Sequence, residues 1–250
     1  MILIENTVTP SPDQWDAIIR GMRNPMNSWD KSDSDTDWPE HPDIYKIGPN
    51  DKTLMMKLAN GGPVHAKYRR MITVYVDITA PLYWWKEFDT YRVGVVDNPT
   101  DIEINSCSTM HKIHTKKFDL GDFSCEYLHS TLGNSYEAMD CLVDIINCLN
   151  KYRDLYLETK DKYWWWQMIQ LLPSSYNQKR TVMLNYEVLH NIYISRKDHK
   201  LDEWRDFCKW IEGLPYSEII TGKKASNTCF KCGKEIAEDR TVCIDCCKED

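Results

Sequence analysis

Apolar residues in the first half of the chain are spaced with periods that predict both helices and a strand. Helical spacing is found over residues 12–22 and 51–60, and residues 82–91 suit the start of a further helix. Residues 71–78 are mostly β-branched or aromatic, which indicates a strand. The stretch 27–42, rich in Ser, Asp and Pro, is typical of a loop. The buried face of the first helix is expected to carry Trp15, Ile18, Ile19 and Met22.

The second half of the chain is predicted to be helical. Helical spacing runs over residues 135–160, 163–172, 180–196 and 201–213. The first of these helices should bury a stripe that consists of Met139, Leu142, Val143, Ile146, Leu149 and Tyr152. The expected strands are therefore few, and they lie in the first half of the chain.

The composition argues against several classes of protein. With 31 basic and 38 acidic residues the formal charge is −7, which gives no support to nucleic-acid binding, because phosphates favour a basic surface. No apolar run approaches the roughly 20 residues that span a bilayer. The first residues lack the basic flank and long apolar core of a signal peptide. We therefore expect a cytoplasmic protein with no membrane or nucleic-acid partner.

The 10 cysteines fall into two groups. Five crowd into residues 229–250, and the other five are scattered singly through the preceding chain. Free cysteine behaves as a small hydrophobe, so core packing is the simplest role for the scattered set. This set consists of Cys107, Cys125, Cys141, Cys148 and Cys208.

The segment 229–250 carries two CxxC pairs and is predicted to be a zinc ribbon. Each tight turn directs two thiolates at one ion, and two turns complete a tetrahedral shell. Four thiolates leave no open position, so the expected Zn²⁺ is structural and supplies most of the segment's folding energy. Redox-active or disulfide-paired cysteines are the alternative. The predicted zinc ligands are Cys229, Cys232, Cys243 and Cys246.

Several polar residues between positions 65 and 205 occur in a recognisable order. The predicted strand ends in Ala80-Pro81, Thr90-Tyr91-Arg92 follows it, and Leu172-Pro173 comes later. The order resembles the flavin-dependent thymidylate synthases (ThyX), where an RHR signature stands at the position of residues 90–92. The polar residues that match this family are His65, Arg92, Asn105, Ser108, Asn185, Asn191 and Arg196.

The resemblance implies an α+β fold, with a small, mostly antiparallel sheet flanked by long helices. We expect a ThyX-like domain over residues 1–213, followed by a linker at 214–228 and the ribbon at 229–250. The resemblance also implies a homotetramer that binds FAD and converts deoxyuridine monophosphate (dUMP) to dTMP, with methylenetetrahydrofolate and NADPH as co-substrates. A phage or mobile-element origin would suit such a divergent protein. By resemblance the substrate ligands are Arg92, Asn105, Ser108 and Arg196, and the flavin-facing residues are His65, Asn185 and Asn191.

Some of these residues have suitable chemistry on their own. Arg92 and Ser108 both donate hydrogen bonds, and such a pair suits a phosphate. Asn185 and Arg196 are separated by about three helical turns, so they are expected on one face of the predicted helix. Arg196 can instead serve the helix dipole and pair with Glu203. A lone histidine such as His65 is more often structural than functional.

Two carboxylates change the electrostatic expectation. Glu87 stands where the family has glutamine, and Glu187 stands where it has arginine. Added negative charge disfavours phosphate and flavin diphosphate, unless lysines such as Lys67, Lys86 and Lys112 compensate. The main alternative is therefore a non-catalytic nucleotide-binding or regulatory protein that uses its ribbon to bind a partner. An enzyme for another pyrimidine nucleotide and a DNA-binding ribbon protein also stay open.

Overall fold

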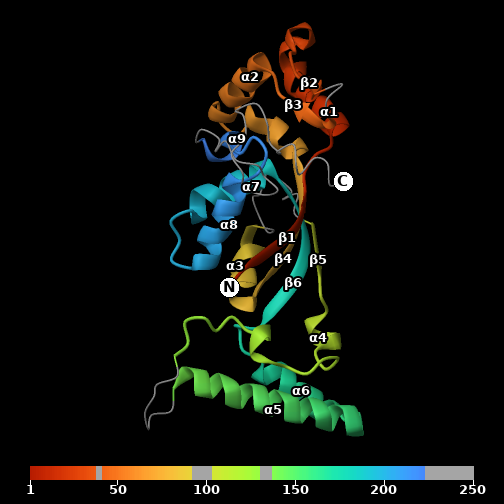
Figure 1. Cartoon of the computed structure of the whole chain (residues 1–250), viewed down its shortest axis with the longest axis vertical. Coiled ribbons are helices and arrows are strands. Elements are labelled where there is room, and N and C mark those ends of the chain that lie inside the picture. The colour runs from red at the N-terminus through yellow and green to blue at the C-terminus, as the bar shows by residue number, and fades with distance from the viewer. Residues whose placement is uncertain (38–40, 92–102, 130–136, 223–250) are drawn as a thin grey trace. The chain divides into compact units, whose positions relative to one another are not determined.

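A computed structural model describes residues 1–37, 41–91, 103–129 and 137–222 (Figure 1). The chain divides into two compact units. Unit 1 comprises residues 1–3, 77–90 and 104–181, and unit 2 comprises the described parts of 4–76, 91–103 and 182–250. The predicted zinc ribbon lies outside the described residues. None of the helices in the described ranges is long and apolar enough to cross a membrane.

A four-stranded sheet has the strand order β1-β4-β6-β5. Its strands are β1 (Leu3–Val8), β4 (Thr73–Pro81), β5 (Glu103–Ser106) and β6 (Asn177–Asn185). At one end of the central pair, the Ile72 carbonyl accepts a hydrogen bond from the Tyr186 N–H at 3.0 Å. At the other end, the Tyr176 carbonyl accepts one from the Leu82 N–H at 3.0 Å. These pairings show that β4 and β6, which lie side by side in Figure 1, are antiparallel.

Strand β6 corrects the prediction of one helix over residues 180–196. Residues 180–185 are extended, and the helix α7 (Tyr186–Arg196) begins only after them. Val182 and Leu184 are fully buried, whereas Thr181 is exposed. Burial of every second residue is the pattern of a strand. A short apolar run can fit either period, so the pattern alone did not separate strand from helix.

Unit 1 contains a helical hairpin and its own apolar core. Its helices are α3 (Leu82–Phe88), α4 (Thr109–Lys112), α5 (Ala138–Thr159) and α6 (Lys162–Leu171), with the 3₁₀ turn η5 (Leu120–Asp122). Helices α5 and α6 pack side by side (Figure 1). The predicted stripe of α5 is confirmed at Leu142, Ile146 and Leu149, but Val143 is 38% exposed and does not belong to it. The core consists of Ile113, Phe118, Phe123, Leu142, Ile146, Leu149 and Met168.

The helices of unit 2 are α1 (Pro12–Arg23), α2 (Pro49–Asn60), α7, α8 (Asp202–Glu212) and α9 (Glu218–Thr221), with the 3₁₀ segments η1 (Asn24–Met26), η2 (Trp29–Lys31) and η3 (Ala66–Met71). Helix α7 packs against α8, α9 and η3, and α1 and α2 both pack against η3. The predicted inner face of α1 is confirmed, because all four of its apolar residues are buried. Strands β2 (Asp35–Asp37) and β3 (His41–Lys46) form an antiparallel pair that overlaps the stretch 27–42, which was predicted to be a loop. The 3₁₀ turn η4 (Asp89–Tyr91) contributes residues to both units.

A buried carboxylate organises the start of α2. Asp51 is fully buried, pairs with the Arg23 guanidinium, and accepts hydrogen bonds from the Ser32 and Ser34 hydroxyls at 2.8 and 2.6 Å. The Asp33 carboxylate caps the same helix, because it accepts from the Asp51 N–H at 3.0 Å. Gly48 is required at the N-cap, since a Cβ there would lie 2.2 Å from the Asp33 carbonyl oxygen. This network joins α1, through Arg23, to the segment 32–34 and to the start of α2.

Two further predictions concern the linker and the scattered cysteines. Residues 214–222, at the start of the predicted linker, are packed into unit 2, where Ile219 and Ile220 of α9 are buried. Core packing is confirmed for Cys208, which is 3% exposed. It is wrong for three cysteines, because their side chains lie on the surface of unit 1: these are Cys107, Cys141 and Cys148.

Candidate functional site

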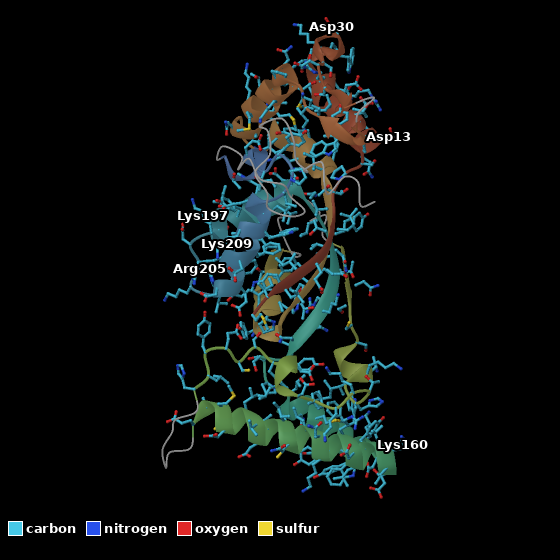
Figure 2. The ribbon with its side chains drawn as sticks, viewed as in Figure 1. Asp13, Asp30, Lys160, Lys197, Arg205 and Lys209 are labelled. Carbon is cyan, nitrogen blue, oxygen red and sulfur yellow. The ribbon has the colours of Figure 1, made fainter. Side chains whose placement is uncertain are left out.

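Arg196, the last residue of α7, packs against two aromatic rings of unit 2. Its Nε donates a hydrogen bond to the Tyr91 hydroxyl at 2.8 Å. Its Cζ lies 4.8 Å from the centre of the Trp204 ring and 5.5 Å from that of Tyr91. Cation–π attraction and the hydrogen bond together hold the guanidinium in place. The next residue, Lys197, instead points outward into solvent (Figure 2).

The start of α7 is set by Asn185, which is only 1% exposed. Its side-chain oxygen accepts a hydrogen bond from the Val188 N–H at 3.0 Å, so Asn185 is the N-cap of the helix. Asn185 and Arg196 therefore stand at the two ends of α7, Asn185 as its N-cap and Arg196 as its last residue. Asn185 precedes the helix, and its carbonyl group is used to begin α7.

Helix α8 supplies the aromatic side of the Arg196 environment. Trp204 is in the first turn of α8 and is fully buried. The connection from α7 is held by Arg205, whose Nη1 donates to the carbonyls of His199 at 2.7 Å and Lys200 at 3.0 Å. The Trp204 ring is thus a fixed platform, because both its burial and the preceding backbone restrict its movement.

Glu187, in the first turn of α7, forms a buried ion pair with Arg69 of η3. Its Oε2 lies 2.7 Å from Arg69 Nε. The two atoms are not aligned as a hydrogen bond, so the attraction is mainly Coulombic. Arg69 also donates from Nη1 to the Ile219 carbonyl at 3.1 Å. The expectation of an uncompensated negative charge at Glu187 is therefore wrong, and the compensating residue is Arg69 and not a lysine.

One turn further along α7, His190 lies close to this pair. Its Nδ1 is 2.6 Å from the Ile220 carbonyl oxygen. Burial lowers the pKa of His190, and the positive charge of Arg69 lowers it further, although the Ile220 carbonyl and Glu187 oppose the shift. The imidazole is therefore neutral at pH 7, with Nδ1–H donating to Ile220.

In unit 1, the predicted substrate ligands Asn105 and Ser108 are both exposed at the end of β5. The Ser108 hydroxyl accepts a hydrogen bond from the His111 N–H at 3.3 Å and caps the short helix α4. Between them, the Cys107 carbonyl accepts from Gln178 Nε2 at 2.8 Å. The segment that carries the two candidates is therefore attached to β6.

Arg180 of β6 is a basic residue that sequence reasoning assigned to a helix. Its Nε donates to Gln178 Oε1 at 3.0 Å, and its Nη1 donates to Asp89 Oδ1 at 2.9 Å. Its Cζ lies 4.2 Å from the centre of the buried Trp85 ring. Arg180 thus links Asp89, at the end of α3, to β6, the strand whose Gln178 bonds to the Cys107 carbonyl. The Asp89 carboxylate offsets the charge of Arg180.

The remaining predicted residues are only partly described. His65 and Asn191 are exposed in unit 2, where either side chain is accessible to a ligand. Arg92 and the four predicted zinc ligands lie outside the described residues. Within the part of the chain that is described, no group of three or more His, Cys, Asp or Glu side chains could hold a metal ion. The zinc site therefore stays a prediction.

Sequence reasoning missed Tyr91 and Trp204 as partners of Arg196. Tyr91 stands in the Thr90-Tyr91-Arg92 stretch, so its place there was a usable signal. No local pattern marks Trp204, which is one of 10 tryptophans.

Comparison with solved structures shows what this arrangement is similar to, whereas no family model and no curated protein sequence matches the chain. The structure of thymidylate synthase X (ThyX) from Helicobacter pylori with FAD and dUMP matches with 16% identity and a TM-score of 0.58, over 88% of this chain and 95% of that one. Another H. pylori flavin-dependent ThyX structure, complexed with FAD and dUMP, matches with 16% identity and a TM-score of 0.56, over 90% and 98%.

A third similar structure is the UMP/dUMP methylase PolB from Streptomyces cacaoi bound with 5-Br dUMP. It matches with 12% identity and a TM-score of 0.51, over 85% of this chain and 88% of that one. At such identities the likeness is one of fold. It covers most of each chain and agrees with the antiparallel β4–β6 pair and the flanking helices. The chain therefore has the α+β fold of ThyX, as the sequence resemblance implies.

Proposed function

We propose that this protein binds a pyrimidine deoxynucleotide and acts on it as a divergent flavin-dependent thymidylate synthase, with dUMP as the first candidate substrate. The observation that carries this proposal is the likeness in fold to ThyX over 88% of the chain. The solved ThyX and PolB structures hold dUMP or 5-Br dUMP. A homotetrameric assembly, which the family resemblance implies, forms part of the same proposal.

Arg196 is the best-supported phosphate ligand. Its guanidinium is planar and always charged, so it can bind a phosphate through two parallel charge-assisted hydrogen bonds. It is half-buried, where water screens the attraction less than at the open surface. Asn105, Ser108 and Arg92 stay candidate nucleotide ligands by resemblance, and Ser108 would keep its role as the cap of α4.

The residues of unit 2 are compatible with FAD. The charge conflict expected at Glu187 is removed by its pairing with Arg69. His65 and Asn191 are exposed and would hold the flavin, whereas Asn185 would act through the start of α7 that it caps. When bound and reduced, the flavin supplies the hydride for this class of reaction. The chain's own contribution is to orient the nucleotide and stabilise its charge.

Tritium release from C5-labelled dUMP tests this proposal. The full chain, loaded with zinc, would be assayed with FAD, NADPH and methylenetetrahydrofolate. We expect release that is lost in Arg196→Ala and retained in Lys197→Ala, which removes an exposed charge from the next residue. No release from folded wild-type protein would contradict the synthase proposal.

A non-catalytic nucleotide-binding protein is the second candidate. Tyr91 favours it, because it stands at the position of the histidine in the RHR signature and its hydroxyl is bonded to Arg196. Flavin absorbance of the purified protein, together with calorimetric titration of dUMP, separates the two. dUMP binding without flavin or tritium release would support the binder, and the absence of dUMP binding would exclude both.

A further inference from the structure

We propose that the surface formed by the α5–α6 hairpin and the segment 111–117 binds single-stranded nucleic acid. All of the residues that carry this inference belong to unit 1. They form a row of aromatic rings with positive charges beside it, and such a surface suits a strand whose bases are unpaired. The inference goes beyond the proposed nucleotide chemistry and does not depend on it.

The aromatic row crosses three segments of unit 1. The His114 ring packs edge to face against Tyr156 of α5, with 4.9 Å between centres. One helical turn earlier on α5, Tyr152 stacks on Trp164 of α6, with ring centres 5.9 Å apart and 17° between the planes. Trp164 in turn contacts Tyr163 at 4.9 Å. Since residues four apart are neighbours on a helix, these contacts link all three segments in one row.

The rings of this row are partly packed and partly accessible. Tyr152 and Tyr156 pack against the apolar core of unit 1, yet both are only half-buried. At the end of the row Tyr163 is 57% exposed, and Trp166, one turn further along α6, is 43% exposed. Lys162 Nζ lies 5.7 Å from the centre of the Trp166 ring. A ring that the core already holds can stack on a base with little further loss of side-chain freedom.

Positive charge gathers at the other end of the row, around His114. Segment 111–117 contains three lysines, two histidines and no carboxylate. Arg153 Nε donates to the His114 carbonyl at 3.0 Å, which places its guanidinium beside the row. Burial lowers the pKa of His114, and the positive charges of Lys112, Lys160 and Arg153 lower it further. The charge is therefore locally positive, although the whole chain carries −7.

Carboxylates offset only part of this charge. Two of the cations have partners, in the ion pairs Arg153–Asp154 and Lys116–Asp122. Lys112 and Lys160 are exposed, and neither forms an ion pair within the part of the chain that the structure describes. Figure 2 shows Lys160 at the C-terminal end of α5, directed into solvent. Both lysines can therefore meet the phosphates of a strand whose bases lie along the row.

Two other occupants fit this surface less well. A lipid surface requires a wide apolar face, whereas the exposed side of α6 combines its rings with Lys162 and Gln170. A symmetric contact between two copies of the chain would bring the same cations together, which is unfavourable. A polyanion with stackable bases satisfies both the rings and the charges.

Fluorescence anisotropy of a labelled oligothymidine of about 15 nucleotides tests this inference with the full-length, zinc-loaded protein. One variant combines Lys112→Gln with Lys160→Gln, and a second is Tyr163→Ala. Each is titrated over a range of salt concentrations, and thermal unfolding checks that it is folded. Vesicles that contain phosphatidylserine are titrated in parallel.

Two controls separate this surface from other sources of binding. Lys197→Gln with Lys209→Gln removes the same charge from exposed positions of unit 2. Cys229→Ser removes a predicted zinc ligand, so it reports on any binding by the predicted ribbon.

We expect the wild type to bind the oligonucleotide with an affinity that falls as salt rises. The Lys112 and Lys160 double variant should lower the slope of log K against log salt by about 1.4, because each phosphate contact on a single strand contributes about 0.7. Tyr163→Ala should weaken binding by about tenfold, as for the loss of one stacked base. The unit 2 control should bind like the wild type.

A wild-type chain that does not bind the oligonucleotide would overturn the inference. Equal losses in the unit 2 control and the Lys112 and Lys160 double variant would also overturn it, because the attraction would then be general. Binding lost in Cys229→Ser but kept in both surface variants would place the nucleic acid on the ribbon. Binding to vesicles without binding to the oligonucleotide would identify a lipid partner instead, so either result would overturn the proposed surface.

Discussion

Glu187 and Arg69 form a buried ion pair at the start of α7, with Oε2 and Nε 2.7 Å apart and side-chain exposures of 11% and 3%. Glu187 stands where the ThyX family has arginine, so its negative charge would disfavour the binding of a phosphate or a flavin diphosphate. Arg69 cancels that charge locally. The pair also joins α7 to η3, and the Arg69 bond to the Ile219 carbonyl extends this connection to α9.

Loss of one partner should therefore cost stability. Glu187→Gln leaves the Arg69 charge buried, and we expect the free energy of unfolding in urea to fall by about 3–5 kcal/mol. Replacing both residues, as in Arg69→Met with Glu187→Leu, should cost less than the single change. The exposed pair of Lys209 and Asp206 gives a control, because Asp206→Asn should change stability by less than about 1 kcal/mol. A neutral effect of Glu187→Gln would contradict a structural ion pair.

Acid should destabilise unit 2 in two pH windows. Burial lowers the pKa of His190, so the stability of its neutral form is present above pH 6.5 and declines as pH falls below that value. Burial acts to raise the pKa of Asp51, but hydrogen bonds from Ser34, Ser32 and Arg23 outweigh it and lower the pKa below 3.8. The stability from ionised Asp51 is therefore kept above pH 3.8 and lost as pH falls through the folded-state pKa.

Urea unfolding between pH 8 and pH 3 measures both windows. His190→Gln should flatten the decline that begins near pH 6.5, and Asp51→Asn should flatten the decline below 3.8 while lowering stability at pH 7. If neither variant altered its own window, the acid sensitivity would have to arise from other groups.

Thiol labelling should separate the scattered cysteines by exposure. Cys107, Cys141 and Cys148 are exposed, so they should react with a thiol reagent in the native protein. Cys208 is buried and should react only after urea unfolding. Mass spectrometry of peptides labelled before and after unfolding gives the assignment. Rapid native labelling of Cys208 would contradict its place in the packed face of α8.

The predicted zinc ribbon can be tested by metal analysis. We expect one Zn²⁺ per chain, and we expect Cys229→Ser or Cys243→Ser to remove it. Since residues 1–222 contain the buried clusters of both units, chelation should release the metal while the main unfolding transition is retained. A chain with no bound zinc and oxidised tail cysteines would favour the disulfide alternative.

The elements that could be predicted are those marked by a clear local pattern of apolar residues in the sequence. The buried faces of α1 and α5 follow from local helical spacing, and β4 follows from a β-branched run. Residues 180–185 were wrongly predicted to be helical, because a run of six residues fits both a strand and the first turns of the next helix. The β2–β3 pair lies in a stretch whose Pro and Asp residues are also common in loops.

The candidate site was harder to predict because its contacts are long-range. Arg196 was identified by resemblance, but its bond to Tyr91 joins residues 105 positions apart, and no local spacing records it. The pairing of Glu187 with Arg69 was missed for the same reason, since only lysines had been considered as compensating residues. Asn185 was named as a candidate site residue from the sequence. Its role as a helix cap could not be predicted, because the residues before it were assigned to the helix and not to a strand.

Strand β6 and helix α7 meet at Asn185 with no intervening loop residue. In an α-helix each residue turns the chain by about 100°, so one inserted or deleted residue between this cap and Arg196 would carry the guanidinium to another side of α7. A substitution at one position would leave the direction of Arg196 around the axis of α7 unchanged. During divergence α7 should therefore accept substitutions freely at exposed positions such as Ile194, while the length between Asn185 and Arg196 stays constant.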